Sequence, residues 1–238
     1  MSYKTILVFA AHPDDEMAMS GTMSKAAALG VRVVIVQSTN GSEGYPRPDM
    51  KDTIVAVRRK EADEADKVLG TERIHLGHDD MALTNNKPTF KQFIKVIRSV
   101  RPDAIFTHGP HDLHRDHLAT SALSIEARWQ AGQPVAAQLG ESWKTPHLYF
   151  YKAVRGAEPD YEVDISGYAH KSAEARRTQV SQHTLFRKTV EDFDREIEAI
   201  KKSNERRTER FWNADVVLGY PTLSNENVPR PEWMIALR

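Results

Sequence analysis

Short apolar runs rich in β-branched residues alternate with longer amphipathic segments along most of this 238-residue chain. Continuous apolar runs are typical of strands buried on both faces, and the segments between them have the length and charge of helices. Strands that alternate with helices favour a parallel sheet with helices on both sides. We therefore expect an α/β fold, a Rossmann-like three-layer sandwich with a mostly parallel sheet.

The apolar runs and the turn residues place these elements along the chain. Strands are predicted at residues 4–10, 31–39, 73–77, 103–108, 147–153 and 161–165. Helices are predicted at residues 16–29, 50–69, 90–100 and 116–130, and the charged stretch 168–210 is also predicted to be helical. Because the alternation continues across the irregular stretches 41–49 and 131–146, we expect residues 1–238 to form a single domain.

Composition excludes several classes of function. Lysine plus arginine (33) balances aspartate plus glutamate (33), so net charge gives no reason to expect a nucleic acid or an anionic membrane as partner. No stretch approaches the roughly 18 apolar residues that cross a bilayer, and the first residues do not predict a signal peptide. We expect a cytoplasmic protein. With no cysteine in the chain, any metal must be held by histidine, carboxylate or water.

Polar side chains gather directly after the predicted strands. The first strand is followed by AHPDDE, the second by TNGSEG, the third by HDD, and the fourth by HGPHDLHRDH. Seven of the ten histidines lie in or beside these segments. Because ligands of open α/β sheets bind outside the carboxyl ends of the strands, these segments predict a functional site at that edge.

The residue types after the first strand suit a catalytic zinc ion, which takes three protein ligands and leaves one position open. His12 and Asp15 can reach one ion from a turn stiffened by Pro13, and the histidine cluster at 108–117 can supply a third ligand. Asp14 lies between the two ligands and can accept the proton of an attacking water as general base. Considered without the histidine cluster, the same turn has a simpler interpretation, in which Asp14 or Asp15 only caps the start of a helix.

AHPDDE after the first strand, together with HRDH at 114–117, resembles the LmbE-like or PIG-L family of zinc-dependent N-acetylglucosaminyl deacetylases. The resemblance runs from the first strand to about Gln182. It implies an LmbE-like fold, a zinc cofactor, and hydrolysis of the N-acetyl group of an N-acetylglucosamine-containing small molecule, releasing acetate. Relatives in this family are often homo-oligomers.

The resemblance also implies roles for individual residues. His12, Asp15 and His117 would hold zinc, and Asp14 would be the general base. A charged His114 would stabilise the oxyanion or protonate the leaving amine. The role implied for Asp116 is to hold His114 charged and oriented. Arg58 and Asp80 fall where the family places groups that contact substrate.

Some positions depart from the family pattern or have a simpler interpretation. Arg115 replaces the usual proline, and Ser172 and Gln179 replace a lysine and a histidine near the end of the pattern. Arg58 could instead pair with Glu61 one helical turn away, and Asp80 could cap a loop.

Two other functions remain open on sequence grounds, and a third fits the fold but is disfavoured. The chain could be an amidase acting on another amide such as a thiol conjugate, which would release a larger acid than acetate. It could also be a sugar-binding relative without activity, which would lack stoichiometric zinc. A dinucleotide-binding protein is disfavoured because the first strand is followed by HPDDE rather than G-x-G-x-x-G.

Overall fold

The computed structural model describes residues 3–152, 154, 156–220 and 228–237. Within these ranges an eight-stranded sheet has the order β3-β2-β1-β4-β5-β7-β6-β8. The strands are β1 (Thr5–Ala10), β2 (Arg32–Thr39), β3 (Glu72–His78), β4 (Ala104–Thr107), β5 (His147–Phe150), β6 (Tyr161–Asp164), β7 (Thr208–Asn213) and β8 (Ile235–Ala236). β1 to β5 are parallel, and β6, β7 and β8 add antiparallel pairs. The mostly parallel α/β sheet is confirmed.

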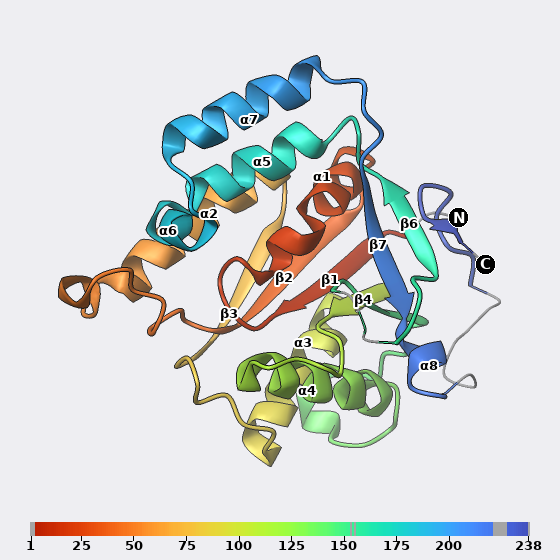
Figure 1. The fold of residues 1–238 in the computed structure, drawn as a ribbon. Coiled ribbons are helices and arrows are strands. Elements are labelled where there is room, and N and C mark those ends of the chain that lie inside the picture. The colour runs from red at the N-terminus through yellow and green to blue at the C-terminus, as the bar shows by residue number, and fades with distance from the viewer. Residues whose placement is uncertain (1–2, 153, 155, 221–227, 238) are drawn as a thin grey trace.

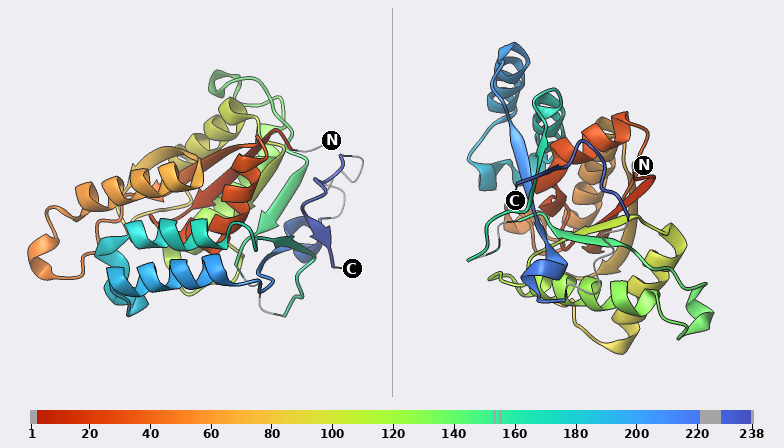
Figure 2. Two further views of the ribbon diagram at one scale, coloured as in Figure 1. Left: turned by 90° about the horizontal axis from the view of Figure 1, so that it is seen from above. Right: turned by 90° about the vertical axis from the view of Figure 1, so that its right-hand side faces the viewer.

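Helices cover both faces of the sheet (Figure 1). They are α1 (Ser20–Ala28), α2 (Ile54–Leu69), α3 (Lys87–Val100), α4 (Arg115–Ala131), α5 (Ala169–Thr178), α6 (His183–Phe186), α7 (Val190–Lys202) and α8 (Ala214–Val217). Figure 2 shows α1, α2 and α5 on one side, with α7 outside α5, and α3 and α4 on the other. Among the described residues, no helix has the length and apolar character to span a bilayer.

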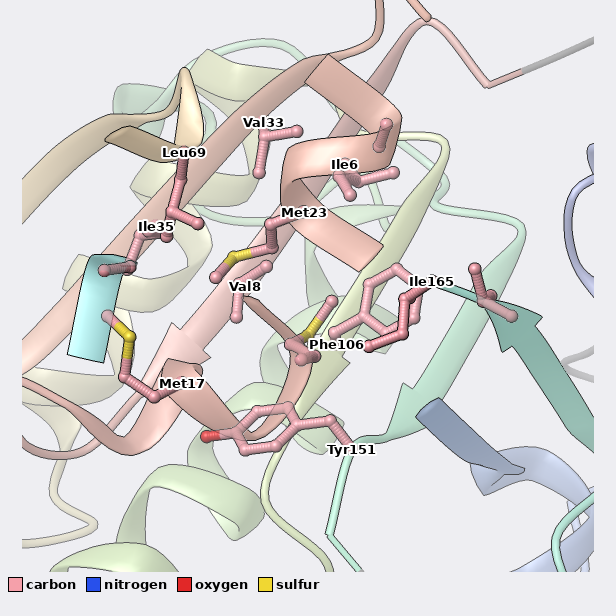
Figure 3. Packing of buried hydrophobic residues seen from close by; sticks show 14 of the residues in the cluster. Ile6, Val8, Met17, Met23, Val33, Ile35, Leu69, Phe106, Tyr151 and Ile165 are labelled. Carbon is pink, nitrogen blue, oxygen red and sulfur yellow. The ribbon is translucent and has the colours of Figure 1, made fainter. Parts of the chain in front are cut away.

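Alternate side chains of the central strands enter two separate apolar cores. Ile6 and Val8 of β1 face α1 and α2 and pack with Met23 and Leu69, as Figure 3 shows. The intervening Leu7 and Phe9 of β1 face α3 and α4. This alternation buries β1 on both sides, which explains why its sequence is apolar throughout.

Several predicted boundaries differ from the structure. The helix predicted at 16–29 begins as a 3₁₀ turn, Asp15–Met19, before α1, and the helix predicted at 50–69 begins only at Ile54. The strand predicted at 147–153 ends at Phe150, and its last residue, Ala153, lies outside the described residues. The prediction that 168–210 is helical throughout is wrong, because the chain forms α5, α6 and α7 and then enters β7.

Candidate active site

The sheet order brings the two richest polar segments together. β1 and β4 are adjacent and parallel, so the turn after β1 and the loop after β4 leave the same edge of the sheet. His12 and Asp15 come from the first, and His117 from the first turn of α4. The pairing of β1 with β4, whose partner residues such as Ile6 and Ala104 are 98 positions apart along the chain, therefore assembles the site.

The three predicted metal ligands lie together. His12 Nδ1 is 3.2 Å from His117 Nε2 and 3.3 Å from Asp15 Oδ2, and His117 Nε2 is 3.2 Å from Asp15 Oδ1. A tetrahedral ion with ligands at about 2.0–2.1 Å needs donor atoms about 3.3 Å apart. The His12–His117 separation, and the distance from each histidine to its nearer Asp15 oxygen, are close to this value, so the three side chains could hold a metal ion.

A carboxylate fixes the outward-facing nitrogen of each histidine. Asp116 Oδ2 lies 3.0 Å from His12 Nε2, and Asp112 Oδ2 lies 2.8 Å from His117 Nδ1. Both outer nitrogens can therefore donate, which leaves His12 Nδ1 and His117 Nε2 unprotonated toward the metal position. Metal-ligating histidines commonly have such partners, which set the tautomer and ring orientation.

The structure places Asp116 on His12 rather than on His114, where the sequence predicted it. Asp116 is fully buried, and its Oδ2 also accepts the backbone N–H of Met81 at 2.7 Å. The distance from His114 Nδ1 to Asp116 Oδ2 is 3.9 Å. Asp116 contacts a predicted ligand directly, so it belongs to the support of the metal site.

His114 lines the cavity beside the three predicted ligands. It caps the start of α4, and its Nδ1 accepts the backbone N–H of Asp116 at 3.2 Å. Burial, together with the nearby His12 and His117, lowers the pKa of His114 below its ordinary value. Because Nδ1 is an acceptor, the proton of a neutral His114 ring lies on Nε2.

A second buried histidine lies behind the triad. His108 is fully buried, and its ring stacks on His117 with centroids 4.2 Å apart. Its Nε2 accepts the Ala11 N–H at 3.1 Å and lies 2.8 Å from the Tyr151 hydroxyl. Burial lowers the pKa of His108 to about 4. His108 could form a donor group with Asp15 and His117, but its Nε2 already has these partners.

Asp14 has a backbone conformation that side chains other than glycine rarely adopt, with φ at +117°. Its N–H donates to Glu16 Oε2 at 3.1 Å, and its Oδ2 lies 3.0 Å from Arg58 Nη2. Burial raises the pKa of the Asp14 carboxyl to about 7, although the Arg58 guanidinium acts in the opposite direction. A carboxyl with this pKa is suited to general-base chemistry near neutral pH.

Arg58 can reach Asp14 because Gly41 and Gly44 have no side chains in the space that its guanidinium occupies. It is buried, and its Nη2 also donates to the Pro13 carbonyl oxygen. A Cβ on Gly44 would lie 2.3 Å from Arg58 Nη1, and one on Gly41 would lie 2.8 Å from Arg58 Cδ. The TNGSEG segment is therefore shaped around this arginine. Its predicted alternative partner, Glu61, accepts hydrogen bonds from Ser181.

Asp80 holds the rim segment in place. Its two oxygens accept the backbone N–H groups of Gly41 and Glu43, at 2.9 and 3.0 Å. Asp80 also lines a cavity that opens at the three predicted metal ligands and has a volume of about 270 Å³. The lining residues are His12, Asp14, Asp15, Glu43, Gly44, Arg58, Asp80, Met81, His114, His117 and Gln182.

Sequence reasoning did not identify several residues that support the site. Glu16 is fully buried and pairs with Arg73, whose guanidinium also contacts both oxygens of Asp66. Lys152 Nζ lies 2.9 Å from Asp15 Oδ1. Glu16 stands inside AHPDDE and could have been noticed there, whereas nothing in the sequence relates the lysine or the arginine to the metal position.

The structure is that of an α/β protein with a group of histidine and aspartate side chains that could hold a metal ion at the edge of a parallel sheet, and comparison with known proteins places it more narrowly. Residues 7–128 match the model of the family described as PIG-L, GlcNAc-PI de-N-acetylase. The chain belongs to this family, which confirms the resemblance.

Named relatives and solved structures agree with this placement. The diacetylchitobiose deacetylase of Thermococcus kodakarensis is 30% identical over 192 residues, which cover 75% of this chain and 70% of that protein. A 1D-myo-inositol 2-acetamido-2-deoxy-alpha-D-glucopyranoside deacetylase of Streptomyces scabiei is 31% identical over 63% of this chain, but the match spans only 56% of that longer protein. The structure of N,N'-diacetylchitobiose deacetylase from Pyrococcus horikoshii superposes with a TM-score of 0.74 at 26% identity, covering 88% of this chain and 83% of that one.

Proposed function

We propose that this protein is a zinc-dependent N-deacetylase that hydrolyses the acetamide of an N-acetylglucosamine-containing small molecule and releases acetate and a free amine. The observation that carries the proposal is the position of Asp14. Its carboxyl has a pKa raised to about 7 and stands in the same cavity as a donor triad spaced for a tetrahedral ion. A metal site with an adjacent base is the arrangement that amide hydrolysis needs.

The proposed ligands of zinc are His12 through Nδ1, His117 through Nε2, and the Asp15 carboxylate. Bound zinc would supply Lewis acidity toward the acetyl carbonyl and lower the pKa of coordinated water. Nitrogen and carboxylate donors suit zinc, and the chain has no thiolate to offer. The carboxylates of Asp112 and Asp116 keep the two imidazoles in the required tautomers.

The side chains around the triad have separate tasks in the proposed reaction. Asp14 accepts a proton from the attacking water and can return it to the leaving amine. Arg58 holds the Asp14 carboxylate in one orientation through the contact at 3.0 Å. Neutral His114 donates from Nε2 to the oxygen that becomes negative as the acetyl carbon turns tetrahedral.

The proposed role of Arg58 and Asp80 toward substrate is mainly to shape the cavity. Both line it, but each is already engaged, Arg58 with Asp14 and Asp80 with the rim segment that contains Glu43. The amino-sugar class of substrate is supported by relatives named as deacetylases of diacetylchitobiose and of an acetamido-deoxyglucose linked to inositol. A single domain for residues 1–238, a cytoplasmic location and assembly into a homo-oligomer stay predictions.

The test is to replace Asp14 without disturbing the metal ligands. Purified protein is assayed for acetate release from N-acetylglucosamine and N,N'-diacetylchitobiose, and its zinc content is measured. We expect Asp14→Ala to retain zinc and lose turnover by about 10²- to 10⁴-fold, and His117→Ala to lose zinc. The matched control is Asp194→Ala. Asp194 is an exposed residue of α7 that pairs with Arg177 of α5, so this variant should have wild-type activity.

Three results would contradict the proposal. Near-full activity of Asp14→Ala would remove the general-base assignment. Release of a larger acid in place of acetate would indicate an amidase of another kind. Wild-type protein that binds the sugars but contains no stoichiometric zinc would favour a binding protein.

A further inference from the structure

Glu61 is a buried carboxylate on α2 that has no basic partner. It is 7% exposed, and it forms no ion pair among the residues that the structure describes. Arg58, three residues before it on the same helix, pairs with Asp14 instead. Both donors to Glu61 come from Ser181, whose N–H donates to Oε1 and whose hydroxyl donates to Oε2, each at 2.7 Å. Because burying a charge without compensation is costly, this carboxylate depends on Ser181.

The Ser181 hydroxyl extends the effect of Glu61 to a third residue. A hydroxyl has one hydrogen, and here it is donated to the carboxylate, so Oγ can only accept from any other partner. Gln182 meets this condition with its amide nitrogen, because Nε2 donates to Ser181 Oγ and to the Gly44 carbonyl oxygen, both at 2.8 Å. Glu61 therefore sets the direction of the Ser181 hydrogen bonds, and Ser181 favours the Gln182 orientation that holds Gly44.

This chain of hydrogen bonds ends at the rim of the active-site cavity. The 3₁₀ turn Val180–Gln182 follows α5 and packs on α2, and Figure 1 shows α5 beside that helix. Asp80 holds the rim segment, residues 41–44, through two backbone N–H groups. Gln182 holds the same segment from α5, at the Gly44 carbonyl oxygen. The rim segment is therefore anchored on two sides of the cavity.

The position of Gly44 decides how much room the Arg58 guanidinium has. A Cβ on Gly44 would collide with the Arg58 side chain, so backbone and guanidinium lie directly against each other. The same guanidinium lies 3.0 Å from the Asp14 carboxylate, the proposed general base. A shift of the Gly44 backbone would therefore change how Arg58 holds Asp14.

We propose that Glu61 is a positioning residue that acts through Ser181 and Gln182 to fix the Gly44 backbone and so the space that keeps Arg58 beside Asp14. Glu61 itself does not line the cavity. The expected effect on turnover rests on the proposed function, whereas the hydrogen bonds between Glu61 and Gly44 can be tested without it.

Glu61→Gln preserves the size of the side chain but leaves one acceptor oxygen. The Ser181 N–H can only donate, so it takes that oxygen, and the new NH₂ group then faces Ser181 Oγ. The hydroxyl hydrogen must turn toward Gln182 Nε2, where two donors meet, and the hydrogen bond to Gly44 is lost. Acetate release from N,N'-diacetylchitobiose should show kcat lower by about three- to ten-fold, the effect of about one hydrogen bond. KM should stay within about two-fold, with zinc content unchanged.

Two further variants show whether Glu61 acts through Ser181. Ser181→Ala removes the hydroxyl but leaves Gln182 bound to Gly44, so kcat should fall by at most about two-fold. In the Ser181→Ala background, Glu61→Gln should add less than about two-fold, because the hydroxyl that relays its effect is gone. Glu64→Gln, an exposed change on the same helix, is the matched control and should have wild-type activity.

The hydrogen bonds are measured directly in the full-length protein labelled with ¹⁵N. Exchange of the Gln182 side-chain NH₂ hydrogens with water is compared with that of the exposed Gln138, and Gln182→Glu assigns the signals. In wild type both hydrogens of Gln182 should exchange at least about ten-fold more slowly than those of Gln138. One should lose this protection in Ser181→Ala, and both should lose it in Glu61→Gln.

The outcomes separate this inference from the proposed function. Wild-type protein that releases no acetate would overturn the proposed function. Gln182 hydrogens that stay protected in Glu61→Gln would overturn the inference alone, as would a loss of kcat of the same size with and without the Ser181 hydroxyl. In that last case Glu61 would contribute only to the stability of α2. If Glu61→Gln does not fold, Ser181→Ala still decides, because protection of both Gln182 hydrogens in that variant would contradict the proposed chain.

Discussion

The tautomer of His117 should depend on Asp112, and Asp112→Asn tests this directly. Asp112 is only partly buried, so the variant should fold. Its Oδ2 lies 2.8 Å from His117 Nδ1, and its Oδ1 accepts the His114 N–H at 2.9 Å. Although burial acts in the opposite direction, the His114 amide and the His117 ring hold the pKa of the Asp112 carboxyl below its ordinary value. The carboxylate is therefore ionised at neutral pH and uses both oxygens.

Asparagine has only one oxygen to satisfy these two donors. If its oxygen keeps the His114 amide, its NH₂ group faces His117 Nδ1 and favours the proton on Nε2, the nitrogen proposed to bind zinc. Loss of such a partner typically weakens metal binding by about 10- to 100-fold, which is about 1.4–2.8 kcal/mol. The loss should not be larger, because α4 and the stacked ring of His108 still position His117.

Zinc affinity is measured by competition with a chromogenic chelator, using metal-free wild type, Asp112→Asn and the control Asp194→Asn. Circular dichroism establishes that all three are folded. At saturating zinc, Asp112→Asn should recover turnover within a few-fold of wild type, because Asp14 is untouched. Zinc affinity within two-fold of wild type would refute the reasoning and would mean that packing alone sets the His117 ring.

Two further changes probe the surroundings of the site and the fold. Gly44→Ala places a Cβ 2.3 Å from Arg58 Nη1, so the guanidinium must shift from its present position beside Asp14. Acetate release at saturating zinc should then fall by at least about ten-fold with zinc content unchanged; an unchanged rate would show that Arg58 does not orient the base. Arg128→Met leaves the buried Asp215 carboxylate without its partner, and urea unfolding should show a loss of about 3–5 kcal/mol; a loss under 1 kcal/mol would mean that water compensates this charge.

The sequence carries most of the information about the parallel part of the sheet. β1 from Ile6 to Ala10 and β2 from Val33 to Val36 are apolar and buried, because both of their faces are covered, and such runs are hard to mistake for anything but buried elements. The strand β7 was missed for a physical reason. It begins Thr208-Glu209-Arg210 after a long charged stretch, where residues with good helix propensity dominate. Its pairing with β6 is tertiary and overrides that propensity.

In the candidate site, too, some contacts follow from residues close together in the sequence, whereas others depend on the tertiary fold. His12 and Asp15 are three residues apart, so their convergence follows from one turn. The partner of Asp116 could not be read from spacing. The sequence places it two residues from His114, but the start of α4 uses the His114 ring as a cap and turns the buried carboxylate toward His12 in the turn after β1.

The three carboxyl groups of the DDE sequence differ in their surroundings, and this difference suggests how one turn can serve ligand, base and support. Asp15 contacts both histidines of the triad, which favours its ionised form as a ligand. Glu16 is committed to Arg73 and to the Asp14 N–H, so it is available neither to metal nor to substrate. Only Asp14 is left, held at φ +117° between them. A strained backbone costs on the order of 1–3 kcal/mol and persists only where neighbours enforce it. Because Glu16 and Arg58 enforce it here, the turn can present a carboxyl of raised pKa beside the metal position without using that carboxyl as a ligand.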